Sequence, residues 1–328
     1  PPVGYAVYDL RFSGKESKSQ ASKASSIENS TYKLTLNDDG DIVSLIDKRA
    51  AKELVKPGKA VRLAIFTENE SYDWPAWEIL KKTIDATPKS INDDVKMSLV
   101  EEGPLRSTLL VEKKHGDSSF SQYIRLYEGE LADRIDFYNE VDWNTLNALV
   151  KAEFPLSVAN ERAVYDLGLG TVARGNNKPS AYEVFSHRWA DLTDASGDYG
   201  VTVMNDCKYG WDKPDDNTIR LTLLHTPKTK YGYRYQDHQD LGHHTFTYTL
   251  QGHSGVLDQA SADRRADALN QRVKAYSTEK HPGKLGKSFS AASLDNDGMA
   301  LKAFKKAEVS DEYVVRVYDT DGKGGKGT

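Results

Sequence analysis

The densest group of potentially reactive side chains lies between Asp237 and His244, where two aspartates and three histidines fall within eight residues. Histidine and carboxylate side chains bind zinc, which takes three or four ligands at about 2 Å. In a strand beginning here, His243 and His244 point to opposite faces, and His244 shares its face with Phe246 and Tyr248. This geometry works against convergence on one ion. The pattern therefore favours a polar start of a strand over a metal site.

Two segments rich in Asp and Gly resemble parts of a calcium-binding loop, at Asn37–Asp41 and Asp295–Gly298. An EF-hand loop with Gly at its sixth position needs Glu at its twelfth. The twelfth position falls on Ile46 in the first segment and on Phe304 in the second. Both segments are therefore predicted to be turns.

The remaining chemistry-bearing residues form no recognisable catalytic set. Cys207 is the one cysteine, which excludes a disulfide within the chain. A nucleophilic cysteine needs a neighbouring base, and no motif places His187 or His225 beside it, so Cys207 is expected to be a small residue at a strand end. Gly168–Gly170 is too short for a phosphate-binding loop. Among 49 carboxylates, no motif singles out the pair that glycoside hydrolysis requires.

Most of the secondary-structure elements that the sequence predicts around these residues are strands. Tyr32–Leu36 alternates apolar and polar residues, and Asp39-Gly40 joins it to Ile42–Ile46 as a predicted hairpin. Helical spacing is best in the segment from Ala262 to Val273. Many strands, Gly and Asp turns and few helices predict an all-β protein of antiparallel sandwiches. The same pattern predicts that Tyr123–Tyr127 pairs with Arg134–Val141 and that Met299–Lys305 pairs with Tyr313–Tyr318. It also predicts that Tyr199–Met204 and Thr218–Leu224 flank one loop, which contains Lys213–Asn217. Further strands are predicted at Tyr5–Leu10 and Thr245–Leu250.

The composition indicates which kinds of binding partner are to be expected. The formal net charge of −5 over 328 residues, with no basic stripe, argues against nucleic acid as a partner. No run of about 18 apolar residues is present, so no membrane-spanning helix is expected. The 18 Tyr and five Trp suit half-buried strands, and they also suit contacts with sugar rings.

An ordered series of short segments carries the clearest resemblance. Met204–Gly210, with the sequence MNDCKYG, is followed by Leu221–Pro227, by the alternating Asp240–Leu250 segment and by His253-x-Gly255. This series resembles the C-terminal β-region of glycoside hydrolase family 38, the retaining α-mannosidases. The usual Pro before the His-x-Gly motif is Gly252 here.

Other segments match the same region in the same order, so that the resemblance covers nearly the whole chain. They are Pro2–Tyr5, Tyr32–Leu34, Asp39–Gly40, Ser44–Lys48, Asp142–Trp143, Lys151–Pro155, Arg174, Glu183, Trp189–Leu192, Lys305–Glu308 and Arg316–Tyr318.

The resemblance implies a fold for this chain and a separate domain for catalysis. The β-region is similar to the large sandwich, or supersandwich, of galactose mutarotase, followed by a smaller partial β-sandwich. In the full enzymes an N-terminal α/β catalytic domain supplies the Asp nucleophile, the acid/base carboxylate and the zinc ligands. None of these is expected in this chain, so we expect it to contain no catalytic residue, metal or cofactor and to be inactive alone.

The resemblance also implies partners and site residues. The β-region packs on the catalytic domain and lends polar groups to the sugar cleft, so that domain and mannose-containing glycans are the expected partners. The first candidates for the edge of the cleft are Asn205, Asp206, Lys208 and Tyr209, and the second are Tyr5, Asp240 and His244. The alternative role for each of them is to hold a turn or the domain interface.

The chain is expected to divide into four segments and to be a piece of a longer enzyme. These are a lead-in strand and Ser/Lys-rich linker (1–26), a large sandwich (27–257), a crossing segment (258–283) and a small terminal sandwich lacking its closing strands (284–328).

Two alternatives remain open. One is a free-standing aldose mutarotase or epimerase, whose histidine acid and carboxylate base only Asp237–His244 offers. The other is a carbohydrate-binding or protein-interaction module.

Overall fold

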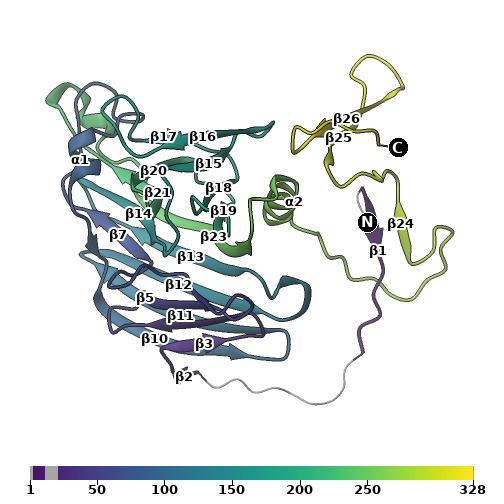
Figure 1. Ribbon diagram of the computed structural model, residues 1–328, viewed down its shortest axis with the longest axis horizontal. Coiled ribbons are helices and arrows are strands. Elements are labelled where there is room, and N and C mark those ends of the chain that lie inside the picture. Colours follow the sequence, from purple (N-terminus) through teal and green to yellow (C-terminus); the bar gives the residue numbers. More distant parts are fainter. Residues whose placement is uncertain (1–2, 12–20, 328) are drawn as a thin grey trace. The chain divides into compact units, whose positions relative to one another are not determined.

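The computed structural model describes residues 3–11 and 21–327 and divides the chain into two compact units (Figure 1). The larger unit comprises residues 18–167 and 171–257, and the smaller one comprises residues 1–17, 168–170 and 258–328. Most of the predicted Ser/Lys-rich linker lies outside the described residues.

A ten-stranded antiparallel sheet forms one layer of the larger unit within the described residues (Figure 1). In spatial order its strands are β16 (Thr171–Gly175), β15 (Arg162–Asp166), β18 (Trp189–Thr193), β19 (Tyr199–Asn205), β23 (Gly242–Ser254), β13 (Ile135–Trp143), β12 (Ser118–Tyr127), β11 (Arg106–His115), β10 (Asp93–Glu102) and β2 (Ser22–Lys23).

A six-stranded antiparallel sheet packs against it across a shared apolar core. Its strands are β17 (Val184–Phe185), β20 (Gly210–Asp215), β21 (Thr218–Thr226), β14 (Ala148–Pro155), β7 (Arg62–Phe66) and β9 (Lys89–Ser90). The remaining elements are a four-stranded sheet of β3 (Ser26–Glu28), β4 (Tyr32–Leu36), β5 (Ile42–Asp47) and β6 (Lys52–Glu53), a parallel pair of β8 (Glu70–Ser71) and β22 (Lys228–Thr229), α1 (Lys81–Asp85) and the short turns η1 (Gly129–Leu131) and η2 (Tyr231–Gln236).

The core between the two main sheets follows from the two-residue period of the strands. Phe137 on β13 lies opposite Tyr248 on β23, and their ring centroids are 4.9 Å apart. Phe154 on β14 of the other sheet meets the same tyrosine edge-on at 5.7 Å. Because side chains alternate along β14, Lys151 and Glu153 point to the outer face of the six-stranded sheet. The predicted all-β class and large antiparallel sandwich are confirmed.

The predicted hairpins are confirmed where the turn chemistry was strongest. β4 pairs with β5 around Gly40, which has φ +68°, a conformation that glycine adopts without strain. A Cβ there would also lie 2.7 Å from a methyl carbon of Val111. β12 pairs with β13, and the Met299–Lys306 strand β25 pairs with the Tyr313–Asp319 strand β26.

Three predictions from local pattern are corrected. Tyr199–Met204 and Thr218–Leu224 do not face each other across one loop, because β20 intervenes and pairs with β21 while β19 joins the other sheet. The strand predicted at Tyr5–Leu10 is limited to β1 (Gly4–Ala6), because its partner β24 (Ser288–Ser290) has only three residues. The C-terminal end of the predicted linker forms β2 and β3, since backbone pairing needs no apolar periodicity.

The smaller unit contains the pairs β1–β24 and β25–β26 and the helix α2 (Gln259–Asn270). Asp258 caps α2, because its carboxylate accepts a hydrogen bond from the Ser261 backbone N–H at 3.0 Å. The helix ends before Val273, which is 96% exposed and therefore does not continue the predicted apolar stripe. In the part of the chain that the structure describes, no helix has the length and apolar character needed to cross a membrane.

Candidate functional site

The candidate loop Asn205–Gly210 carries the chain from β19 in one sheet to β20 in the other. Asn205 is 1% exposed and acts as its anchor. Its amide nitrogen donates to the His187 carbonyl at 3.1 Å, and its amide oxygen accepts from the Lys208 N–H at 2.8 Å. Since both ends of the amide are engaged within the protein, Asn205 shapes the loop rather than facing a ligand.

Asp206 extends the sheet beyond the end of β19. Its backbone N–H donates to the Thr247 carbonyl at 3.1 Å, and its carboxylate accepts from the Thr247 N–H at 3.0 Å. The Asp206 carboxylate thus takes the place of the backbone carbonyl that would accept this hydrogen bond if the strand continued. Asp206 has a positioning role in this geometry.

Lys208, which is half-buried, and Tyr209, which is exposed, are the two residues of the loop that offer a cation and a phenol. The ammonium of Lys208 lies 4.9 Å from the centre of the Phe246 ring, a cation–π contact that fixes the direction of the side chain. Tyr209 is 57% exposed. The loop therefore places a hydrogen-bonding cation and a phenol near its tip, supported by the buried Asn205 and the half-buried Asp206.

Cys207 lies in this loop, but its environment does not favour a nucleophile. Although the residue is exposed at the surface, partial desolvation by the surrounding loop raises the pKa of its thiol to about 12, and the neighbouring Asp206 carboxylate acts in the same direction. The thiol remains protonated at neutral pH, whereas attack requires the thiolate.

Asp240 and His244 form a second group at the start of β23. The Asp240 carboxylate accepts from the His225 backbone N–H at 2.7 Å, and its carbonyl lies 2.5 Å from the His244 ring. Asp240 has φ +58°, a left-handed conformation that Asp tolerates better than most residues. His243 points the other way, to Asp142 at 2.8 Å, as the alternation of the strand predicts. Within the described residues, no group of three or more His, Cys, Asp or Glu side chains is arranged to hold a metal ion.

Tyr5 belongs to the smaller unit. Its ring lies 6.0 Å from that of Phe289, and its hydroxyl donates to the Gly286 carbonyl at 3.3 Å.

His225 is a residue that the sequence pattern did not assign to the site. Its Nε2 lies 3.1 Å from the Pro75 carbonyl, and its Nδ1 lies 3.0 Å from the Asn69 amide nitrogen. The carbonyl requires a proton on Nε2 and the amide requires none on Nδ1, so the contacts fit the neutral ring. Burial agrees, because it lowers the pKa of His225. The signal available in the sequence was a histidine near the end of a predicted strand, directly after Leu223 and Leu224.

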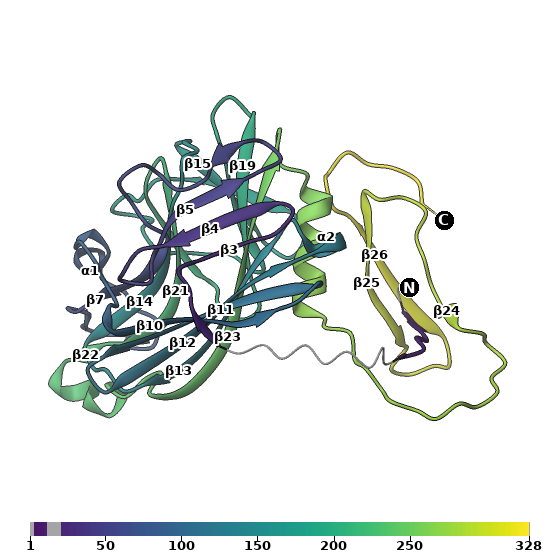
Figure 2. The ribbon, with the colours of Figure 1, turned by 90° about the horizontal axis from the view of Figure 1, so that it is seen from below.

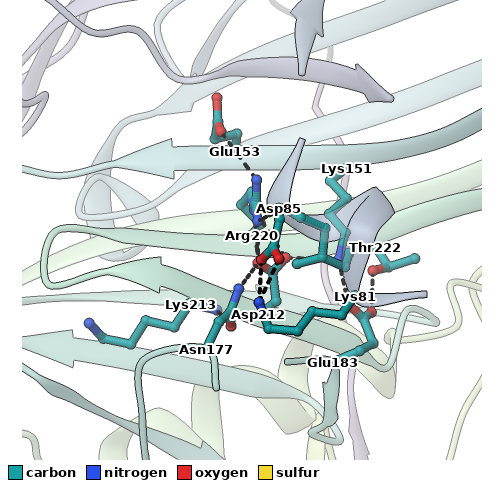
Figure 3. A network of polar contacts seen from close by, with 11 residues as sticks. Lys81, Asp85, Lys151, Glu153, Asn177, Glu183, Asp212, Lys213, Arg220 and Thr222 are labelled. Carbon is teal, nitrogen blue, oxygen red and sulfur yellow. Dashed lines mark hydrogen bonds and ion pairs between the residues drawn. The ribbon is translucent and has the colours of Figure 1, made fainter. Parts of the chain in front are cut away.

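A buried network of charges occupies the outer face of the six-stranded sheet (Figure 3). The Lys151 ammonium lies 2.6 Å from Glu183 and 2.8 Å from Asp212. The Arg220 guanidinium donates to Asp212 at 3.0 Å, and Glu153 accepts from Arg62 at 2.7 Å. Figure 3 shows Lys151, Asp212 and Arg220 converging from β14, β20 and β21.

The electrostatics of this network match a closed structural site. Burial raises the pKa of Glu183, against the opposing effect of Lys151. Burial alone would raise the pKa of Asp212 as well, but Lys151 and Arg220 lower it below its usual value. Lys151 is fully buried and Arg220 is 3% exposed, so no substrate reaches them. Such a network orders the sheet and the segments that cover it.

This network gives a structural role to three residues that matched the family in sequence. It also contains two residues that the sequence comparison did not single out. Lys151, Glu153 and Glu183 were noted only as sequence matches, and the structure gives them a common role. Asp212 and Arg220 could have been found from alternation, because Arg220 stands between the core residues Ile219 and Leu221 on β21.

The sequence of this chain is similar to those of known proteins from one family. Residues 27–232 match the family described as "Glycosyl hydrolases family 38 C-terminal domain". Alpha-mannosidase G of Dictyostelium discoideum is 28% identical, over 98% of this chain and 31% of its own length. Alpha-mannosidase 2C1 of Mus musculus is 26% identical, over 90% of this chain and 28% of its own length. The chain therefore spans about a third of these relatives.

A solved structure extends the similarity to three dimensions. A glycosyl hydrolase family 38 protein from Enterococcus faecalis superposes with a TM-score of 0.74 at 15% identity, covering 93% of this chain and 39% of that one. At this identity the likeness establishes the fold.

Proposed function

Because the chain belongs to the glycosyl hydrolase family 38 C-terminal domains, we propose that it is the accessory β-region of a retaining α-mannosidase. In this proposal it supports the catalytic domain and lines one edge of the mannoside cleft. The observation that carries the proposal is the family match over residues 27–232, joined to relatives that are named alpha-mannosidases.

The geometry of the Asn205–Gly210 loop supports the cleft-edge role. A sugar-binding edge needs hydrogen-bonding groups whose positions are fixed before the ligand arrives, because ordering them on binding costs affinity. Asn205 and Asp206 provide that order through backbone contacts. Lys208 and Tyr209 are then the residues proposed to contact sugar hydroxyls.

The other candidates take supporting positions in this proposal. Asp240 and His244 hold the turn at the start of β23. The same strand carries Phe246, whose ring contacts the Lys208 ammonium. Tyr5 remains a candidate from the smaller unit.

The catalytic chemistry is assigned to the partner domain. The proposed partners are that N-terminal catalytic domain and mannose-containing glycans. Zinc is proposed for the catalytic domain, as the resemblance to the retaining α-mannosidases implies. No step of the reaction is therefore assigned to this chain, and α-mannoside hydrolysis is proposed for the longer enzyme only.

Two measurements test the proposal. The isolated chain should release no product from an aryl α-mannoside with or without added zinc, and turnover would contradict it. In the longer polypeptide, Tyr209→Ala should raise KM for the α-mannoside with little change in stability, because Tyr209 is exposed. An unchanged KM for both Tyr209→Ala and Lys208→Ala would remove the cleft-edge role.

A further inference from the structure

Two neighbouring tryptophans stand on the surface of the larger unit. Trp74 is 61% exposed and Trp77 is 83% exposed, and their rings lie 6.1 Å apart with planes only 20° from parallel. The other three tryptophans of the chain, Trp143, Trp189 and Trp211, are fully buried. Exposed aromatic groups of this size mark interaction sites when they cluster.

The turn that carries these rings is fixed by its own hydrogen bonds. The Glu78 carboxylate accepts from the Ser71 hydroxyl at 2.7 Å and from the backbone N–H groups of Tyr72 and Asp73. The Trp74 carbonyl accepts from the Glu78 N–H at 2.7 Å. The tryptophans are therefore presented on an ordered turn between β8 and α1, so binding would cost little ordering entropy.

A second segment adds aromatic and charged groups beside this turn. β22 runs parallel to β8, and Lys230 follows it, with its ammonium 5.1 Å from the Tyr72 ring and 3.2 Å from Asp73. Figure 2 shows β22 and α1 at the same end of the sandwich. Tyr231 and Tyr235, in the η2 turn that follows, are 83% and 75% exposed.

A polar cavity of about 310 Å³ adjoins the aromatic surface. Lys82 joins the two features, because it lines the cavity and also donates to the Tyr72 hydroxyl at 2.9 Å. The full lining consists of Glu68, Glu70, Lys82, Ala86, Asn147 and Lys228.

The charges of the lining identify the kind of ligand. Two carboxylates and two ammonium groups cancel, so the cavity has no net preference for an anion or a cation. It does offer many hydrogen-bond donors and acceptors to a neutral polyhydroxylated molecule. Its volume lies at the lower end of the range for small-molecule sites.

We propose that the cavity and the Trp74–Trp77 surface together bind an oligosaccharide of pyranose sugars. The cavity would take one ring through its hydroxyls, and the C–H face of a further ring would stack on the negative face of an indole. A protein partner fits less well, because charged residues are depleted at the core of protein interfaces. Here Lys82 and Lys230 both lie against the ring of the neighbouring Tyr72, and Lys230 pairs with Asp73. This proposal does not depend on the cleft-edge role of the Asn205–Gly210 loop.

The experiment titrates the complete chain with α-linked mannotriose and with maltotriose, by calorimetry and by iodide quenching of tryptophan fluorescence. Iodide should reach only Trp74 and Trp77 among the five tryptophans, so a bound sugar should reduce quenching. We expect saturable binding of at least one sugar in the millimolar range. Trp77→Ala and Glu68→Gln should each weaken binding by about tenfold or more.

Matched variants separate the possible outcomes. Tyr276→Ala removes an aromatic ring that is 84% exposed in the other unit, and it should leave binding unchanged. Absence of binding by both sugars, or binding that Trp77→Ala and Glu68→Gln leave intact, overturns the proposal. Binding lost only in Tyr209→Ala also overturns it, because the sugar would then occupy the Asn205–Gly210 loop. Self-association that disappears in Trp77→Ala, without sugar binding, would identify a protein interface instead.

Discussion

Replacing Lys151 by methionine tests the role of the buried charge network. Lys151 is fully buried, and its ammonium lies 2.6 Å from Glu183 and 2.8 Å from Asp212. Methionine retains most of the volume but leaves two carboxylates without this cation, the fully buried Asp212 and Glu183, whose side chain is 19% exposed. Removing one partner of a buried ion pair costs about 3–5 kcal/mol.

The assay is urea unfolding of the chain, followed by the fluorescence of the buried tryptophans Trp143, Trp189 and Trp211. With a urea dependence of roughly 3 kcal/mol per M, the unfolding midpoint should fall by about 1–2 M. The matched control is Lys114→Met, which breaks an ion pair of 2.9 Å whose side chains are 58% and 65% exposed. That change should not shift the midpoint measurably, because exposed ion pairs contribute little.

The pH dependence of Lys151→Met sharpens the test. Burial already raises the pKa of Glu183, and loss of the neighbouring cation should raise it further. A carboxyl whose pKa is higher in the folded state favours folding at low pH, and that contribution is lost as pH rises. The deficit of the variant should therefore shrink between pH 8 and pH 5, and adding Glu183→Gln should recover part of it at pH 8. A deficit below about 1 kcal/mol, or one equal at both pH values, would refute the structural role of the network.

Three further predictions concern single side chains. Asn205→Ala should lower the free energy of unfolding by about 1–3 kcal/mol, because it removes two part-buried hydrogen bonds to backbone groups; an unchanged urea midpoint would contradict the anchoring role. An NMR titration should give His225 a pKa below its usual value, because of burial, and His253 one above it, because Asp191 outweighs burial. The contribution of His225 to the free energy of unfolding should therefore be lost as pH falls, and that of His253 should be lost as pH rises. If His225→Gln and His253→Gln changed the pH dependence of stability in the same direction, these environments would be wrong. Cys207 should react with iodoacetamide at pH 8 more slowly than free cysteine, since its pKa is raised to about 12; a rate equal to that of free cysteine would contradict the protonated thiol.

Local pattern was sufficient for a large part of the fold. Alternation and Asp-Gly turn chemistry predicted the β4–β5 hairpin, and similar signals predicted β12–β13 and β25–β26. These elements depend on neighbours a few residues away, so their sequences contain the information that forms them. The family resemblance, which rests on ordered short segments, was likewise readable from the chain alone.

The candidate site was only partly readable in this way. The sequence identified the Asn205–Tyr209 loop as unusual but did not separate its anchors from its outward residues. The structure makes that separation, because Asn205 and Asp206 bond to backbone groups of His187 and Thr247, each distant in sequence. The first contact depends on the pairing of β19 with β18, and the second depends on the pairing of β19 with β23.

By itself, the sequence determined the all-β class, the principal turns and the family. Tertiary structure alone decided that β19 and β20 belong to different sheets, that Lys151, Glu183 and Asp212 meet in one buried network, and that Trp74 and Trp77 stay outside the core. The physical reason is that strand periodicity gives each residue a face but not a partner. The partner is chosen by packing between segments that are far apart in the chain.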